Sequence, residues 1–392
     1  MSAMDVGARY LELILRFRQV APALVDSYVG PAQLAARVDA EAPVALSELA
    51  EMAAKLRSDI AGLGLARDRA AWLDGQLRGL EAACEWLAGG ALGYRELVRR
   101  CHGVEAAQVD ESQFEQAHEL IIRALPGRGS ARERFGPWMA GQQVRGEPLV
   151  AGLEALAREL RDRTHARWRL PDQEAITLET ARGQPWAAYA QYEGGLRSLI
   201  RINDELPIAA WRMVELIAHE AYPGHHTEHV CKDVALVAGE HRIEFSVWVY
   251  PTPQALIAEG IAMLAPEILL GEEIEEVSAR CLRPLGIAYD IAGSAAVRRA
   301  KEVLVAVRSN LALMLDEEAI DEAGMRAYAR RWLLEDDGYV NRVIDSMHQQ
   351  RWPPYESCYP DGLRLCRRFV DGDPDRFGRL LREQLTPEAL IR

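Results

Sequence analysis

The residues with the clearest chemical potential lie in one short segment of the chain. Four of the nine histidines fall within residues 219–229, and Glu220 directly follows the first of them. Neutral imidazoles are common zinc ligands, and a carboxylate beside them can take a proton from metal-bound water. A mostly apolar run over residues 213–218 precedes the cluster. This grouping predicts a catalytic metal site rather than a set of surface histidines.

The spacing of these histidines departs from the zinc motif His-Glu-x-x-His, which places two imidazoles on one helical face. The fourth residue after His219 is Pro223. Proline removes a helical N–H, and Gly224 readily adopts a left-handed turn, so the helix should kink or end there. The second ligand must then follow the break. On an unbroken helix His226 lies nearer the face of His219, whereas a kink could return His225 to it.

A second metal motif overlaps the first one. The later part of the cluster matches the inverted pattern His-x-x-Glu-His. In this alternative, His225 and His229 would bind the metal and Glu228 would be the base. This reading leaves His219 and Glu220 without a role, so we treat it as the minor alternative.

Three segments together resemble the DUF885 family, whose members are helix-rich and similar to gluzincin metallopeptidases. Residues 219–226 read His-Glu-Ala-Tyr-Pro-Gly-His-His, similar to the family signature His-Glu-Ala-x-Pro-Gly-His-His. Residues 259–265 resemble its Glu-Gly-Trp-Ala-Leu-Tyr-Ala, and residues 353–362 its Pro-Gly-Gln-x-x-Ser-Tyr-x-x-Gly. The three segments occur in the family's order and lie in the last half of the chain. Ile261 and Leu264 replace aromatic residues of the second motif.

The resemblance implies a set of metal ligands and a base. His219 and His225 would bind Zn²⁺, with His226 as the alternative second ligand. Glu259, from a later helix, would be the third ligand, and Glu220 would be the general base.

Two tyrosines could donate a hydrogen bond to a developing oxyanion. Tyr359 occupies the matching position of the third motif, and Tyr355 is the weaker candidate. Packing within a Pro-rich loop is the structural alternative for both. As in similar peptidases, a strand over residues 198–203 could lie at the cleft edge and pair with an extended peptide.

These residues predict a zinc-dependent hydrolase of peptide or related amide bonds, with a peptide or small amide as its substrate. The alternative is a catalytically silent metal-binding or scaffolding protein that retains the peptidase-like fold. A metal-free helical binding module is a third possibility, which stoichiometric zinc would exclude.

The composition limits the remaining possibilities. The 392 residues are 49% hydrophobic and 27% charged, and 46 Lys plus Arg against 59 Asp plus Glu give a net charge of −13. This charge argues against nucleic-acid binding. Charges break every long apolar run, which predicts no membrane span. The six cysteines are scattered, and the first residues lack a secretory layout, so we expect reduced thiols in a cytoplasmic protein.

The elements that must position the site are mostly helices. Apolar stripes indicate helices over 6–17, 73–87, 110–125 (from a capping-box-like start), 149–160, 207–218, from 254 onward, and over 290–315, 321–335, 337–349 and 375–385. Short strands are expected at 176–179 and 198–203, a Pro-rich loop at 351–362, and strand or helix at 243–250.

The resulting fold class is mainly α, a helix-rich gluzincin-like architecture with a small β-sheet beside the metal-site helix. We expect a helical N-terminal region, 1–170, and a metal-site catalytic region, 171–392, within one continuous globular unit.

Overall fold

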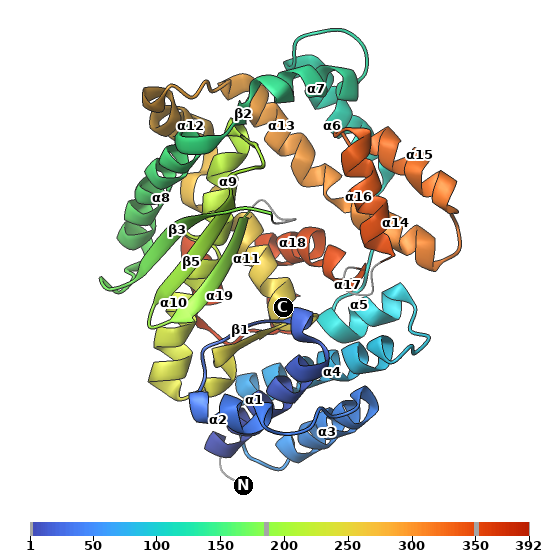
Figure 1. The fold of residues 1–392 in the computed structure, drawn as a ribbon, viewed down its shortest axis with the longest axis vertical. Helices are drawn as coiled ribbons and strands as arrows, with labels where there is room; N and C mark the ends of the chain where they lie inside the picture. The colour runs from blue at the N-terminus through green and yellow to red at the C-terminus, as the bar shows by residue number, and fades with distance from the viewer. Residues whose placement is uncertain (1–2, 184–187, 349–352, 392) are drawn as a thin grey trace.

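The computed structural model describes residues 3–183, 188–348 and 353–391. The fold is mainly α-helical with small sheets, as predicted (Figure 1). The larger buried apolar cluster takes residues from Tyr94 to Leu390, and a second one joins the N-terminal helices to Phe245 and its neighbours. The division near residue 170 stays a prediction.

The N-terminal helices follow the apolar stripes. Tyr10, Ile14 and Phe17 of α1 are buried in the second cluster, which also contains Trp72 and Leu77 of α4. The helices of this region are α1 (Ala3–Val20), α2 (Ala32–Asp39), α3 (Leu46–Ile60), α4 (Arg67–Leu87) and α5 (Tyr94–His102).

The next helices carry their own start signals. Asp110 caps α6 by accepting from the N–H of Ser112 at 2.8 Å, rather than through the predicted capping box. A full capping box instead begins α7, between Ser130 and Glu133. These helices are α6 (Glu111–Ala124), α7 (Ala131–Gly141) and α8 (Gly146–Trp168).

A three-stranded sheet lies beside the metal-site helices, with strand order β3-β5-β4 (Figure 1). β3 and β5 confirm the two predicted strands and are parallel, whereas β4 pairs antiparallel with β5. Because β5 is the central strand, its predicted pairing with a substrate peptide is wrong. The strands are β3 (Ala175–Ala181), β4 (Ala188–Gly194) and β5 (Arg197–Asn203).

Two antiparallel pairs complete the sheets. β1 (Val25–Tyr28) pairs with β7 (Val247–Val249), and β2 (Gln143–Val144) pairs with β6 (Ile208–Ala209). The undecided segment 243–250 therefore contains a 3₁₀ turn, Ile243–Ser246, followed by strand β7.

Three helices carry the histidine cluster and its carboxylate partner: α9 (Ala210–Glu220), α10 (His225–Lys232) and α11 (Pro253–Leu270). A π-helical stretch, Asp233–Ala238, extends α10. The helical stretch Pro253–Leu285 is long and apolar enough to cross a membrane, which corrects the expectation that charge breaks every such run. However, 78% of its apolar window is buried inside the protein, as in a core helix.

The C-terminal part is helical, including the predicted loop. Residues 353–362 form α17 and the start of α18, whereas residues 349–352 lie outside the described ranges. The predicted helix 290–315 is divided at Val305. The helices are α12 (Ile274–Leu282), α13 (Ile291–Leu304), α14 (Ala306–Asp316), α15 (Glu322–Trp332), α16 (Asp337–Met347), α17 (Pro353–Glu356), α18 (Cys358–Val370), α19 (Pro374–Arg382) and α20 (Pro387–Ile391).

Candidate metal centre

The turn between α9 and α10 brings two histidines of the cluster together. α9 ends at Glu220 and α10 begins at His225, so the predicted break occurs, although the helix stops before the proline. The N–H of Gly224 donates to the carbonyl oxygen of Ala218 at 2.9 Å, which folds the turn against the end of α9. A Cβ on Gly224 would lie 1.9 Å from the carbonyl oxygen of His219. Glycine permits this close approach, which returns His225 to His219.

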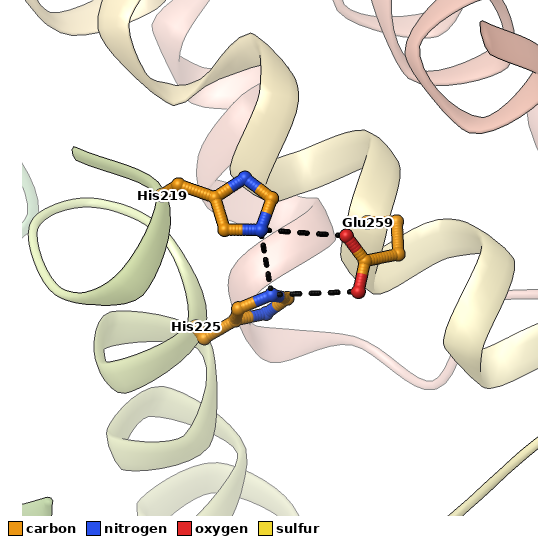
Figure 2. A group of neighbouring side chains, drawn as sticks. All are labelled: His219, His225 and Glu259. Atoms are coloured by element: carbon orange, nitrogen blue, oxygen red, sulfur yellow. Dashed lines mark hydrogen bonds and ion pairs between the residues drawn. The ribbon is translucent and has the colours of Figure 1, made fainter. Parts of the chain in front are cut away.

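Three predicted ligands converge at this point. Figure 2 shows His219, His225 and Glu259 directed toward one another from α9, α10 and α11. The two Nε2 atoms are 3.2 Å apart. Glu259 Oε2 lies 3.4 Å from His219 Nε2, and Oε1 lies 3.6 Å from His225 Nε2. Tetrahedral zinc, with ligands at about 2.0–2.2 Å, separates its ligand atoms by roughly 3.3–3.5 Å. The separations in the triad therefore lie close to those of a tetrahedral zinc site.

One oxygen of the buried Glu259 carboxylate lacks a hydrogen-bond donor among the described residues. Its side chain is only 2% exposed. Oε1 accepts a hydrogen bond from the Tyr355 hydroxyl at 2.7 Å, whereas Oε2 accepts none from the described residues. A buried carboxylate oxygen without a donor is costly, and a cation held between this oxygen and the imidazoles would remove that cost. The residues present thus fit a bound zinc ion.

The protonation states of the triad also suit a metal. Burial works against the charge of Glu259, but His225, His219 and Tyr355 together lower its pKa to about 2. Burial lowers the pKa of His225 to about 4, so this imidazole is neutral. Burial also disfavours protonated His219, but the neighbouring Glu259 carboxylate outweighs it and raises the His219 pKa. Metal binding must therefore displace a proton from His219 at low pH.

Glu220 lies beside the triad and lines the same cleft. Burial raises its pKa to about 7; the charge of His219 opposes this shift, and the charges of Glu259 and Asp26 support it. A carboxyl group with a pKa near the working pH can accept and return a proton efficiently. The position and pKa of Glu220 both suit a general base.

Tyr355 lies closer to the triad than Tyr359, which the sequence ranks first. The Tyr355 hydroxyl contacts Glu259 directly, and the Tyr359 hydroxyl donates to the Tyr355 hydroxyl at 3.2 Å. Both tyrosines line the cleft. Tyr355 is thus the better-placed hydrogen-bond donor, and Tyr359 supports it from α18.

Two glycines allow α18, which carries Tyr359, to approach α11. A Cβ on Gly260 would lie 2.3 Å from the carbonyl oxygen of Gly362. A Cβ on Gly362 would lie 2.4 Å from the carbonyl oxygen of Leu256. The two helix backbones touch at positions where any side chain would collide. The glycine that follows Glu259 therefore has a structural role next to the ligand.

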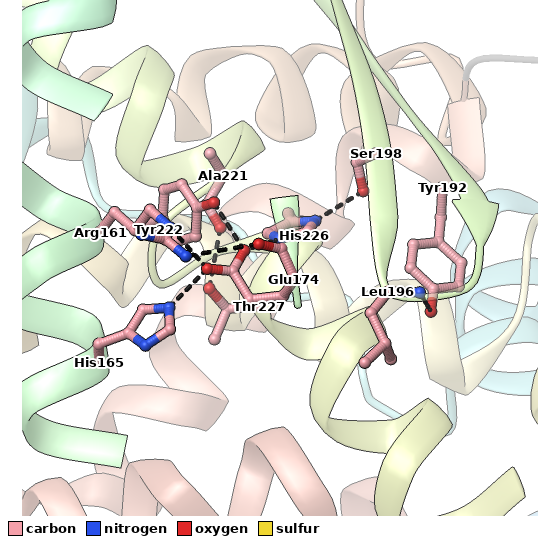
Figure 3. Close-up of polar contacts among 10 residues, drawn as sticks. All are labelled: Arg161, His165, Glu174, Tyr192, Leu196, Ser198, Ala221, Tyr222, His226 and Thr227. Atoms are coloured by element: carbon pink, nitrogen blue, oxygen red, sulfur yellow. Dashed lines mark hydrogen bonds and ion pairs between the residues drawn. The ribbon is translucent and has the colours of Figure 1, made fainter. Parts of the chain in front are cut away.

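His226 has partners away from the triad (Figure 3). Its Nε2 lies 2.7 Å from Glu174 Oε2, and its Nδ1 lies 2.8 Å from Ser198 Oγ. Burial lowers the pKa of His226, although Glu174 opposes that shift, so the ring is neutral. It donates Nε2–H to the carboxylate and accepts from the serine hydroxyl. The structure does not support His226 as the second metal ligand.

Glu174 is a residue that the sequence analysis missed. Burial disfavours its charge, but hydrogen bonds from His226, His165 and Tyr222 lower its pKa to about 2. Through these hydrogen bonds, the Glu174 carboxylate links α8 and the start of β3 to the turn between α9 and α10. No local pattern marks it, because its partners come from two separate segments, α8 and the histidine segment. They are Arg161 Nε at 2.7 Å, His165 Nε2 at 2.5 Å, the Tyr222 hydroxyl at 2.7 Å and His226 Nε2 at 2.7 Å.

The residues of the inverted motif His-x-x-Glu-His do not come together as a metal site within the described ranges. Glu228 is buried and forms an ion pair with Lys232. The His229 ring stacks on Tyr192, with ring centroids 4.8 Å apart. Within the described ranges, the candidate ligand group contains His225 but neither of the other two residues of that motif.

A cleft of about 970 Å³ opens onto the triad. Its lining includes residues of β1 and β4, the last residues of α9, the first turns of α10, and the two tyrosines. The His219 and His225 side chains are 20% and 15% exposed, and both line the cleft. The volume lies at the upper end of the range for ligand pockets, about 300–1,000 Å³. The cleft can therefore hold more than a single amino acid.

Comparison with known proteins supports the architecture. No family model matches the chain, and no curated protein matches it significantly. A candidate lipoprotein from Colwellia psychrerythraea has a similar structure, with a TM-score of 0.53 and 15% sequence identity. The match covers 92% of this chain and 68% of that chain. At this identity, the likeness concerns the fold alone.

Proposed function

We propose that this protein is a zinc-dependent hydrolase of peptide or related amide bonds, as the resemblance to the DUF885 family and to gluzincins implies. His219, His225 and Glu259 would hold Zn²⁺. The observation that carries the proposal is the triad itself, with ligand atoms 3.2 to 3.6 Å apart at the floor of a cleft. Glu220, which lines the same cleft, would act as the general base.

Zinc, when bound, would polarise a substrate carbonyl and lower the pKa of a coordinated water toward neutrality. Glu220 would accept a proton from the attacking water and return it to the leaving amine. The Tyr355 hydroxyl would turn from Glu259 toward the carbonyl oxygen and donate to it as negative charge develops there. Tyr359 would hold Tyr355 in place.

The cleft is suited to an extended substrate. β4 is an outer strand of its sheet, and Ala188, Tyr189 and Ala190 line the cleft. An extended peptide can add to a strand edge through main-chain hydrogen bonds. We therefore place the peptide along β4, in place of the central strand that the sequence suggested.

The test compares wild type with Glu220→Gln, using a peptide library with and without a chelator. Glu220→Gln should keep one zinc per chain and lose turnover by roughly 10²- to 10⁴-fold. Glu51→Gln is the matched control, because Glu51 is exposed on α3 and does not line the cleft. Full activity in Glu220→Gln would contradict the proposed mechanism. Zinc binding without any cleavage by wild type would favour the silent metal-binding alternative.

A further inference from the structure

Arg201 of strand β5 brings a positive charge to the wall of the cleft. Among the described residues that line the cleft, Arg201 is the one Lys or Arg, whereas three lining residues are acids: Asp26, Glu220 and Glu259. The whole chain has a net charge of −13, so its long-range field repels anions. A guanidinium in this wall therefore offers a local binding point for a negatively charged group.

The guanidinium of Arg201 has donors that the protein does not use. The side chain is half-buried, and Nη1 donates a hydrogen bond to Gln191 Oε1 at 2.9 Å. Within the described ranges it forms no ion pair. Residues 184–187, which precede β4, contain no Asp or Glu. A guanidinium has five N–H donors, so the group can still bind a carboxylate through two parallel hydrogen bonds.

Strand pairing places Arg201 beside the peptide path along β4. Arg201 pairs with Tyr189 of β4, so the two side chains lie on one face of the sheet, and both line the cleft. Gln191 is two residues after Tyr189 and lies on the same face. The hydrogen bond to Gln191 therefore holds the guanidinium over β4, the outer strand to which an extended peptide could add.

Arg201 lies a few residues along the sheet from the metal triad. Ser198 of the same strand contacts His226, whose neighbour in the chain is the proposed ligand His225 (Figure 3). Arg201 follows Ser198 by three positions, which corresponds to about 10 Å along a strand. An extended peptide advances by a similar length per residue. A substrate group at Arg201 would thus lie about three residues from a bond held at the triad.

We propose that Arg201 binds a carboxylate of the substrate, about three residues from the cleaved bond, and that this contact selects which peptides are cleaved. The inference rests on the proposed peptidase function. The carboxylate can be the carboxyl terminus of a short peptide or the side chain of an Asp or Glu. Both present the same planar group to the guanidinium, and blocked peptides distinguish them.

The first test uses zinc-loaded protein and one cleaved peptide sequence without Asp or Glu. The peptide is prepared as the free acid, as the carboxyl-terminal amide, and as the amide with Glu as its last residue. We expect kcat/KM about 10- to 100-fold higher for the free acid than for the plain amide, since hydrogen bonds to charged groups have this effect. A gain for the amidated Glu peptide alone would assign the site to an acidic side chain. No gain for either carboxylate would overturn the inference.

Three variants separate binding from structure. Arg201→Gln should reduce the rate for the free acid to that for the amide. Gln191→Glu should reduce the same preference, because its carboxylate would occupy the guanidinium in place of the substrate. Arg197→Gln is the matched control, because Arg197 is exposed on the same strand and does not line the cleft. An equal loss for free acid and amide in Arg201→Gln would show a structural role instead.

A binding measurement keeps the inference testable if no peptide is cleaved. In zinc-loaded Glu220→Gln, calorimetry should show the free acid binding at least tenfold more tightly than the plain amide. Adding Arg201→Gln should abolish this difference. Equal affinities for the free acid, the amide and the amidated Glu peptide would refute carboxylate recognition. Unequal affinities without turnover by wild type would refute only the hydrolase function.

Discussion

Glu174 accepts a hydrogen bond from His226 Nε2 at 2.7 Å, so this imidazole is held by a carboxylate that is not part of the metal triad. The contact favours His225 over His226 as the second ligand, a choice that the sequence leaves open. His225 turns its Nε2 to His219 and Glu259, and His226 fastens the turn that makes this possible.

The first prediction contrasts these neighbours. His225→Ala should lose zinc, because it removes one of three ligands. His226→Ala should keep one zinc per chain but lower the free energy of unfolding by about 1–3 kcal/mol, because Ser198 and Glu174 each lose a buried partner. Elemental analysis and denaturant unfolding measure the two effects. A folded His226→Ala protein without zinc would contradict the assignment.

The second prediction concerns the turn itself. Gly224→Ala should strongly weaken zinc binding, because the added Cβ would collide with the carbonyl oxygen of His219 and push His225 away. Gly136→Ala is the control, since a Cβ there meets nothing within 4 Å. Zinc titration of both variants gives the answer. Normal zinc affinity in Gly224→Ala would show that the close approach is not needed.

The third prediction ranks the tyrosines. Tyr355→Phe should lower kcat by roughly 10²-fold with unchanged zinc content, because it removes the donor nearest the triad. Tyr359→Phe should have a smaller effect, since its hydroxyl acts through Tyr355. Steady-state kinetics on one peptide compares them. A larger loss in Tyr359→Phe would restore the order that the sequence predicted.

The fourth prediction concerns stability at acid pH, away from the metal. His102 is fully buried between Ser357 and Cys358, and burial lowers its pKa to about 3. In the unfolded chain the pKa is about 6.5. The unfolded state therefore binds the proton first, and stability is lost as the pH falls below about 6.5.

At pH 5 this loss is about 2 kcal/mol relative to neutral pH. Urea unfolding at pH 7 and pH 5 measures it. His102→Gln, which cannot titrate, should narrow the difference between the two pH values by about that amount. An unchanged difference in the variant would show that His102 does not titrate as proposed.

Much of the site could be predicted from the sequence, because its signals are local. The helix break follows from the proline and glycine in the histidine segment, and the apolar stripes mark most helices. The resemblance to the DUF885 family indicated Glu259, on a separate helix, as the third ligand. Its contact with His219 and His225 depends on how three helices pack, and the sequence alone does not show that packing.

The misses have physical reasons. The segment from residue 353 looked like a loop because of its prolines, yet Pro360 lies in the first turn of α18, where a missing N–H costs little. Glu174 forms its hydrogen bond with His226, which lies far away in the chain. No periodicity or motif in the sequence indicates such contacts.

The most direct test of the metal centre is zinc-edge anomalous diffraction from crystals of the zinc-loaded protein. We expect one peak per chain, about 2 Å from His219 Nε2, His225 Nε2 and a carboxylate oxygen of Glu259. A peak whose nearest ligands are His226 or His229, or no peak at the triad, would contradict the account.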